Sequence, residues 1–175
     1  MALFGSNPVF DMLKKDHEKV KTLFEQFEHA KDGRTKQRII QEAIQELDVH
    51  ASLEESLVYP AIREEMDEEE VMDEALEEHH VAHVLLNELK RMRSSTGRSD
   101  AKFKVLGESV KHHIQEEEGT MFPKADKLEL DWNELEQKAL ARKEALMRRR
   151  SSGRKGKRKI HRGRKMHRRR LRKAA

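Results

Sequence analysis

Apolar residues recur along four segments of this chain at alternating spacings of three and four residues. The four stripes are Phe10, Leu13, His17, Val20, Phe24 and Phe27; Ile40, Ala43, Leu47, His50, Glu54 and Leu57; Met72, Leu76, His79, His83, Leu86 and Leu89; and Phe103, Leu106, Val110, His113, Glu117 and Met121. This spacing places one narrow apolar face on each of four helices. No alternating β-branched run predicts a strand, so we expect an all-α protein.

The four predicted helices form two similar pairs. A shift of 63 residues brings His50, Glu54 and Glu55 onto His113, Glu117 and Glu118, and a shift of 62 brings Asp16-His17 onto Glu78-His79. Each pair closes on an aromatic residue and a proline, Tyr59-Pro60 and Phe122-Pro123, where we expect the helix to end or bend. Two such hairpins predict an up-down-up-down four-helix bundle over residues 1–130.

Polar residues interrupt every stripe near mid-helix, where the core of a bundle is driest. An imidazole or carboxylate buried there without a partner is costly. A metal bound at the bundle axis removes that cost for all of them together, and His and Glu four residues apart share one helix face. The predicted metal ligands are His17, His50, Glu54, His79, His83, His113 and Glu117.

This donor set suits two metal ions with one coordination position left open. Imidazole with carboxylate favours iron or manganese over the thiolate-rich zinc pattern, although zinc also accepts these ligands. The chain has no cysteine, which excludes disulfides, thiol chemistry, haem-thiolate and iron–sulfur ligation. Neither a secretory signal nor a membrane-spanning segment is visible, and a cytoplasmic location is therefore expected.

The charge of the chain is divided unevenly. Residues 148–175 carry 16 Lys and Arg and no acidic residue, which leaves 21 basic against 33 acidic residues in positions 1–147. The tail has few apolar residues and is expected to be disordered when free. It is suited to non-specific binding of nucleic acid, an anionic membrane surface or the acidic body itself, or it serves only solubility. Between bundle and tail, residues 131–147 predict a fifth helix, with Trp132 as its anchor.

The ordered motifs of this chain resemble those of the hemerythrin-like HHE cation-binding family over residues 8–127. The residues that carry the resemblance are Asp16-His17, His50 to Glu55 with Tyr59-Pro60, Glu78-His79, and His113 to Glu118 with Phe122-Pro123. The resemblance implies a non-haem di-iron centre with carboxylate and oxo or hydroxo bridges. In the oxygen-carrying members the third helix supplies two histidines four residues apart, which His79 and His83 match. Their last carboxylate follows its histidine by five residues, so Glu118 is the alternative to Glu117.

The function that these observations favour is binding, sensing or scavenging of dioxygen, peroxide or nitric oxide at a His/Glu-ligated pair of iron ions. Two alternatives remain open. One is a catalase-like enzyme that disproportionates peroxide at the same centre. The other is a nucleic-acid-associated, iron-responsive module that acts through the basic tail. Tyr59 is interpreted as a packing residue.

Overall fold

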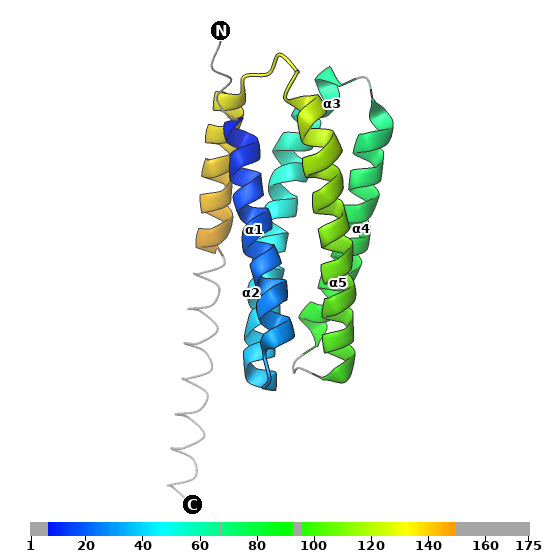
Figure 1. Ribbon diagram of the computed structural model, residues 1–175. Coiled ribbons are helices and arrows are strands. Elements are labelled where there is room, and N and C mark those ends of the chain that lie inside the picture. Colours follow the sequence, from blue (N-terminus) through cyan, green and yellow to red (C-terminus); the bar gives the residue numbers. More distant parts are fainter. Residues whose placement is uncertain (1–6, 67, 93–95, 150–175) are drawn as a thin grey trace, which may run out of the picture. The chain divides into compact units, whose positions relative to one another are not determined.

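Four long helices form the body of the protein. The computed structural model describes residues 7–66, 68–92 and 96–149, and these residues contain helices but no strand. The long helices are α1 (Pro8–His29), α2 (Gly33–Leu53), α4 (Glu69–Arg91) and α5 (Gly97–Glu116). They run alternately up and down, with α1 against α2 and α5, and α4 against α5 and α2 (Figure 1). The predicted all-α, up-down-up-down four-helix bundle is confirmed.

Each hairpin ends in a widened helical turn. The π-helical segments η1 (Glu54–Val58) and η2 (Glu117–Met121) are followed by the short helices α3 (Tyr59–Glu65) and α6 (Phe122–Ala125). In η1 the backbone N–H of Tyr59 bonds to the carbonyl of Glu54, five residues back instead of four. The extra residue advances the buried face by one position, so Val58 is fully buried and the predicted Leu57 only partly so.

The chain stays helical through both prolines. A proline ring inside a regular α-helix meets the carbonyl four residues earlier, and the wide turn leaves room for it. Tyr59 and Phe122, which precede Pro60 and Pro123, both keep right-handed helical dihedral angles. The expected helix stop is therefore replaced by a change of register at the aromatic residue.

The buried face of α4 differs from the predicted stripe. Ala75 is 4% exposed, whereas the predicted Leu76 is 36% exposed. Likewise His83 is only partly buried, and Ala82 lies against the main apolar cluster. The face follows Met72, Ala75, His79, Ala82, Leu86 and Leu89, which keeps strict three-four spacing. The larger neighbours Leu76 and His83 were predicted on this face, whereas the small Ala75 and Ala82 occupy it.

The main apolar cluster lies on one side of the polar interruptions. It joins the C-terminal half of α1, the N-terminal half of α2, the C-terminal half of α4 and the N-terminal half of α5. Phe24, Phe27 and Phe103 pack their rings together at its centre. Because the wide turns lie on the other side, the buried histidines occupy a layer between an apolar core and the two π-helical segments.

The C-terminal region begins with a further helix described at residues 132–149, which starts one residue later and extends two residues further than predicted. The chain divides into two units, residues 1–139 and 140–175, and the bundle and its polar layer belong to the first. Residues 150–175, most of the predicted disordered tail, lie outside the described residues. No helix in the described part of the chain is long and apolar enough to cross a membrane.

Candidate metal centre

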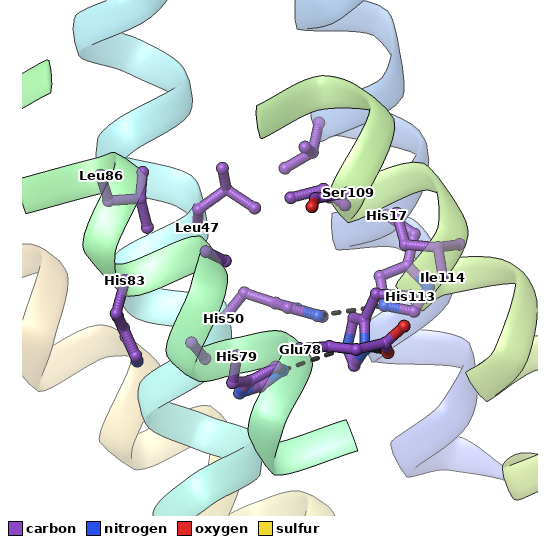
Figure 2. Close-up of a pocket in the computed structure, with 14 residues that line it drawn as sticks. His17, Leu47, His50, Glu78, His79, His83, Leu86, Ser109, His113 and Ile114 are labelled. Atoms are coloured by element: carbon purple, nitrogen blue, oxygen red, sulfur yellow. Dashed lines mark hydrogen bonds and ion pairs between the residues drawn. The ribbon is translucent and has the colours of Figure 1, made fainter. Parts of the chain in front are cut away.

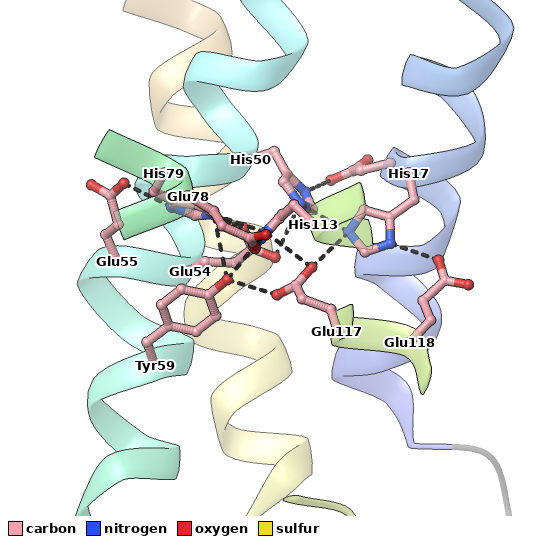
Figure 3. A network of polar contacts seen from close by, with 11 residues as sticks. His17, His50, Glu54, Glu55, Tyr59, Glu78, His79, His113, Glu117 and Glu118 are labelled. Atoms are coloured by element: carbon pink, nitrogen blue, oxygen red, sulfur yellow. Dashed lines mark hydrogen bonds and ion pairs between the residues drawn. The ribbon is translucent and has the colours of Figure 1, made fainter. Parts of the chain in front are cut away.

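Six of the predicted ligands meet in the polar layer of the bundle. Each long helix contributes one imidazole, and the two carboxylates stand at the first residue of each wide turn (Figure 3). The six residues are all buried: His17, His50, Glu54, His79, His113 and Glu117. They form two overlapping groups whose donor atoms lie within 4.8 Å of one another, namely His17, His50, Glu54 and Glu117, and Glu54, His79 and His113.

The imidazoles are arranged in two pairs that face each other through the same ring nitrogen. Nε2 of His17 lies 3.0 Å from Nε2 of His50, and Nε2 of His79 lies 3.0 Å from Nε2 of His113. The two rings of each pair are nearly perpendicular. Each pair therefore directs two nitrogen donors at one point, as the ligands of a common cation do.

The two glutamates link the imidazole pairs. Glu54 places Oε1 at 3.0 Å from Nε2 of His50 and Oε2 at 3.4 Å from Nε2 of His79. Oε2 of Glu117 lies 3.2 Å from Nε2 of His17 and 3.4 Å from Nε2 of His113. Both carboxylates thus stand between two nitrogen pairs, which is the position of a bridging ligand in a two-metal site.

A second layer of carboxylates holds the outer nitrogen of each ring. Nδ1 of His17 donates to Glu118 at 2.7 Å, Nδ1 of His79 to Glu55 at 2.8 Å, and Nδ1 of His113 to Glu78 at 2.7 Å. Nδ1 of His50 faces Asp16 at 3.7 Å, an ion-pair distance that is too long for a hydrogen bond. Since an ionised carboxylate can only accept, each bonded Nδ1 donates a proton, and Nε2 of the same ring points inward.

Tyr59 places the chain's single phenol in the same layer. Its hydroxyl donates to Oε1 of Glu117 at 2.7 Å and lies 3.3 Å from Nε2 of His79. Burial and the charges of Glu54 and Glu117 hold the pKa of Tyr59 well above its usual value, so the hydroxyl stays protonated. The interpretation of Tyr59 as a packing residue missed this contact, because the one-residue shift of the wide turn is not visible in the spacing.

The arrangement fits metal ions better than protons alone. Both oxygens of Glu54 and Oε2 of Glu117 are buried without a hydrogen-bond donor, although imidazole nitrogens stand within ion-pair distance. Two Nε2 lone pairs 3.0 Å apart repel unless a proton or a cation lies between them. A pair of cations satisfies all of these atoms at once. Without cations, the buried carboxylates would need protons to neutralise their charge.

Without a metal, two of the buried histidines, His50 and His79, carry positive charge at neutral pH. Burial lowers the pKa of His50, but the charge of Glu54 and the contact with Asp16 outweigh it and raise that pKa to about 10. For His79, burial is outweighed by its contacts with Glu54 and Glu55, and the pKa is raised to about 9. At Glu54, the charges and contacts of His50 and His79 outweigh burial and hold the pKa of its carboxyl well below the usual range.

The structure does not bring the seventh predicted ligand, His83, into either group. Its Nε2 lies 2.8 Å from Oε1 of Glu55, the same oxygen that accepts from His79, and its side chain is 37% exposed. Glu118, the alternative to Glu117, also lies outside the two groups. The Glu118 side chain is 30% exposed and contacts the outer nitrogen of His17, whereas that of Glu117 is 1% exposed.

A small apolar cavity adjoins the imidazoles. Its volume is about 30 Å³, room for roughly one or two water-sized molecules. Aliphatic side chains form most of its wall on the side of the main apolar cluster, and imidazoles face it from the polar layer (Figure 2). The aliphatic residues are Val20, Leu47, Ala51, Ala82, Leu86, Val110 and Ile114. A cavity of this size and lining admits a diatomic molecule or peroxide and excludes a larger organic substrate.

Some residues of the site were missed as participants by sequence reasoning. Asp16 and Glu78 entered only as markers of the repeat, yet they face Nδ1 of His50 and His113 across the helix pairs. The signal that could have found them is the repeat itself, since both immediately precede a ligand histidine and occupy matching positions. His80 and His112, which stand next to His79 and His113 in the sequence, are exposed.

Comparison with known proteins gives a consistent family relationship. The family model of the hemerythrin HHE cation-binding domain matches residues 9–125. The crystal structure of a hemerythrin HHE cation-binding domain-containing protein from Mycobacterium kansasii has a TM-score of 0.66 and 26% sequence identity. The similarity covers 78% of this chain and 85% of that one.

Two curated proteins are similar in sequence. A DNA nickase of Nostoc is 30% identical over 115 residues, which cover 64% of this chain and 32% of the nickase. A hemerythrin-like protein of Schizosaccharomyces pombe is 28% identical over 121 residues, covering 68% of this chain and 60% of that protein. The chain thus matches about a third of the nickase and somewhat over half of the yeast protein.

Proposed function

The chain belongs to the hemerythrin HHE cation-binding domain family, and from this premise we propose that it is a non-haem di-iron protein that binds, senses or scavenges dioxygen, peroxide or nitric oxide. The observation that carries the proposal is the convergence of four Nε2 atoms and two buried carboxylates, three of whose four oxygens have no hydrogen-bond donor. Two iron ions held there would supply one- and two-electron exchange with a small oxidant. Imidazole and carboxylate donors with no thiolate favour iron over zinc.

The two metal positions differ in the number of donors that the chain offers. One position has His17 and His50 with both glutamates, and the other has His79 and His113 with Glu54. Glu117 is not in the second group, although its Oε2 lies 3.4 Å from Nε2 of His113, and the Tyr59 hydroxyl stands beside this position. His79, His113 and Glu54 would hold one of the two ions, and a small oxidant bound there would lie near the Tyr59 hydroxyl.

The surrounding residues orient and protect such a centre. Carboxylates at the outer nitrogens fix the imidazole tautomers and make each ring a stronger donor. The hydroxyl of Tyr59 offers a proton donor within the buried layer, while the apolar cavity limits the approach of water. These features support reaction with a molecule of a few atoms and give no room for a bulky substrate.

Metal analysis under exclusion of oxygen tests the proposal. We expect two iron ions per chain, and an optical band from oxidant-bound iron when air or peroxide is admitted. His50→Ala removes one inward nitrogen and should abolish both, whereas His80→Ala, an exposed neighbour of His79, serves as the matched control. Protein that takes up no iron, or iron that does not respond to any of the three oxidants, contradicts the proposal.

A catalase-like reaction is a second candidate at the same centre. It is supported by the Tyr59 hydroxyl, because peroxide disproportionation requires a proton to be moved between two oxygen atoms. Evolution of dioxygen from peroxide by the iron-loaded protein, lost in His50→Ala, would distinguish turnover from simple binding. Iron oxidation without gas evolution would leave binding or sensing as the function.

A nucleic-acid-associated role is the third candidate. It is supported by the 16 Lys and Arg of residues 148–175 and by the similarity to a Nostoc protein that is named a DNA nickase. The tail has no aromatic residue for base stacking, so the expected contact is with phosphates and independent of sequence. Iron-dependent changes in DNA binding would connect this role to the metal centre.

A further inference from the structure

A column of aromatic rings connects the metal layer with the surface of the bundle. The ring of Phe122 stacks on that of His17, with centroids 6.0 Å apart and planes 7° apart. The ring of Phe10 stacks on that of Phe122 at 4.4 Å and 9°, and the ring of Trp132 contacts Phe10 at 4.9 Å with its plane tilted by 56°. Phe10 and Phe122 are buried, whereas Trp132 is partly exposed.

The column belongs to one half of the repeat only. Tyr59 occupies the position that corresponds to Phe122, and its ring tilts against His79 while its hydroxyl turns inward to Glu117. Among the described ring contacts, the series from Tyr59 passes to histidines and does not continue outward through further aromatic residues. Among the same contacts, none joins the separate cluster of Phe24, Phe27 and Phe103 to an imidazole of the polar layer.

The residue at the outer end is chemically distinctive. Trp132 is the single tryptophan of the chain, and indole, like phenol, is among the side chains most easily oxidised by loss of one electron. Phe10 and Phe122 are not oxidised themselves but provide close-packed π-systems between donor and acceptor. Partial exposure allows Trp132 to release a proton to solvent and to meet a soluble reductant.

We propose that His17, Phe122, Phe10 and Trp132 form an electron-transfer path. Along it an electron moves from Trp132 at the surface to the metal centre when that centre has been oxidised and no other reductant is bound. Trp132 gives up one electron, which the oxidised centre accepts. The indole then releases its Nε1 proton to water and becomes a neutral radical. A soluble one-electron reductant of the ascorbate class returns the electron, and water returns the proton.

Packing alone would also place apolar rings here, so the experiment must separate conduction from packing. The inference rests on the proposed redox-active iron centre. Iron-loaded protein is mixed with peroxide and frozen within milliseconds to seconds, and radicals are recorded by electron paramagnetic resonance. We expect an indolyl radical in the wild type and its complete loss in Trp132→Phe, which retains an aromatic ring at the same place.

Breaking the column inside the bundle gives an independent test. Phe122→Leu keeps Trp132 but interrupts the path, and the indolyl radical should be strongly diminished. Phe103→Leu removes a buried ring from the separate aromatic cluster and should leave the radical unchanged. Zinc-loaded wild type, whose metal exchanges no electrons, should give no radical, and the melting temperature of each variant reports the packing contribution.

The outcomes separate this inference from the proposed function. Iron that peroxide does not oxidise, judged from the optical spectrum, would sink the proposed function and the path with it. Iron that is oxidised without any signal dependent on Trp132 overturns the path alone. So does a radical that persists undiminished in Phe122→Leu. If Trp132→Phe fails to fold, the comparison of Phe122→Leu with Phe103→Leu decides.

Discussion

The carboxylate of Glu118 lies 2.7 Å from Nδ1 of His17, a residue 101 positions earlier in the chain. Its repeat counterpart, Glu55, lies 2.8 Å from Nδ1 of His79. In both contacts the carboxylate comes from one hairpin and the histidine from the other. The two halves are therefore interlocked at the polar layer, and neither hairpin by itself can complete the oriented set of imidazoles.

Removing the charge of Glu118 should weaken metal binding without removing a ligand. Glu118→Gln loses the carboxylate that orients His17, and outer partners of metal-bound histidines contribute about 10- to 100-fold in affinity. Competition with a metal-sensitive chelator measures the change. Glu116→Gln, an exposed neighbour on the same helix, is the control. Equal affinities for the two variants would show that the contact does not matter to the metal.

Substitution of His79 and substitution of His83 should have very different effects on the metal content of the protein. Nε2 of His79 faces Nε2 of His113, whereas His83 contacts Glu55 outside the two donor groups. His79→Ala should lose metal, and His83→Ala should retain the full metal content with a small change in affinity through Glu55. Elemental analysis of both purified variants decides the matter. Loss of a metal ion in His83→Ala would mean that His83 turns inward on binding.

Loss of the Tyr59 hydroxyl should destabilise the metal-free protein. Tyr59→Phe leaves Oε1 of Glu117 buried without its donor, which costs about 1–3 kcal/mol. Denaturant unfolding measures the difference. The matched comparison is a double-mutant cycle with Glu117→Gln, in which the combined loss should be smaller than the two single losses together. Additive effects would argue against a direct interaction.

The metal-free protein should lose stability at alkaline pH. The pKa values of His50 and His79 are raised in the folded state to about 10 and about 9, from the ordinary histidine value of 6.5. Their contribution to stability is therefore fully present below pH 6.5 and lost as the pH rises through 9 to 10. Melting temperatures between pH 6 and 10 should fall more steeply for the metal-free than for the metal-loaded protein.

Metal binding should release protons over the same pH range, because an imidazole ligand must be neutral. Titration in weak buffer with a pH indicator would record this release. A metal-free protein whose melting temperature follows that of the loaded form across the range, with no protons released, would contradict the assigned pKa directions.

Truncation after Met147 should abolish binding to duplex DNA at low salt. The deletion removes all 16 Lys and Arg of residues 148–175 and leaves an acidic body. Electrophoretic mobility shifts at increasing salt measure the effect, and binding by the full chain should weaken steeply as salt rises. Unchanged helicity and metal content of the truncated protein are the controls. A full chain that fails to bind DNA at low salt removes the nucleic-acid role.

The helices and most of the polar layer could be predicted from spacing alone. His17, His50 and His113 stand on three-four stripes, and such spacing requires a helix to place them inward. Leu76 and Leu57 were assigned wrongly to the core because side-chain size suggested one register where packing chose another. On α4 the small Ala75 faces inward, and after Glu54 the wide turn moves the buried face on by one residue.

What the sequence determined by itself was the bundle, its repeat and the chemical nature of the centre, since helical periodicity and residue type are local properties. Only the tertiary structure decided which carboxylate faces inward and that His83 lies outside the two donor groups. It also decided that Tyr59 contacts Glu117 whereas Phe122, at the matching position, stacks on His17. These outcomes depend on the register of two π-helical turns and on contacts between hairpins. Both arise from packing between segments distant in the chain, which no local spacing records.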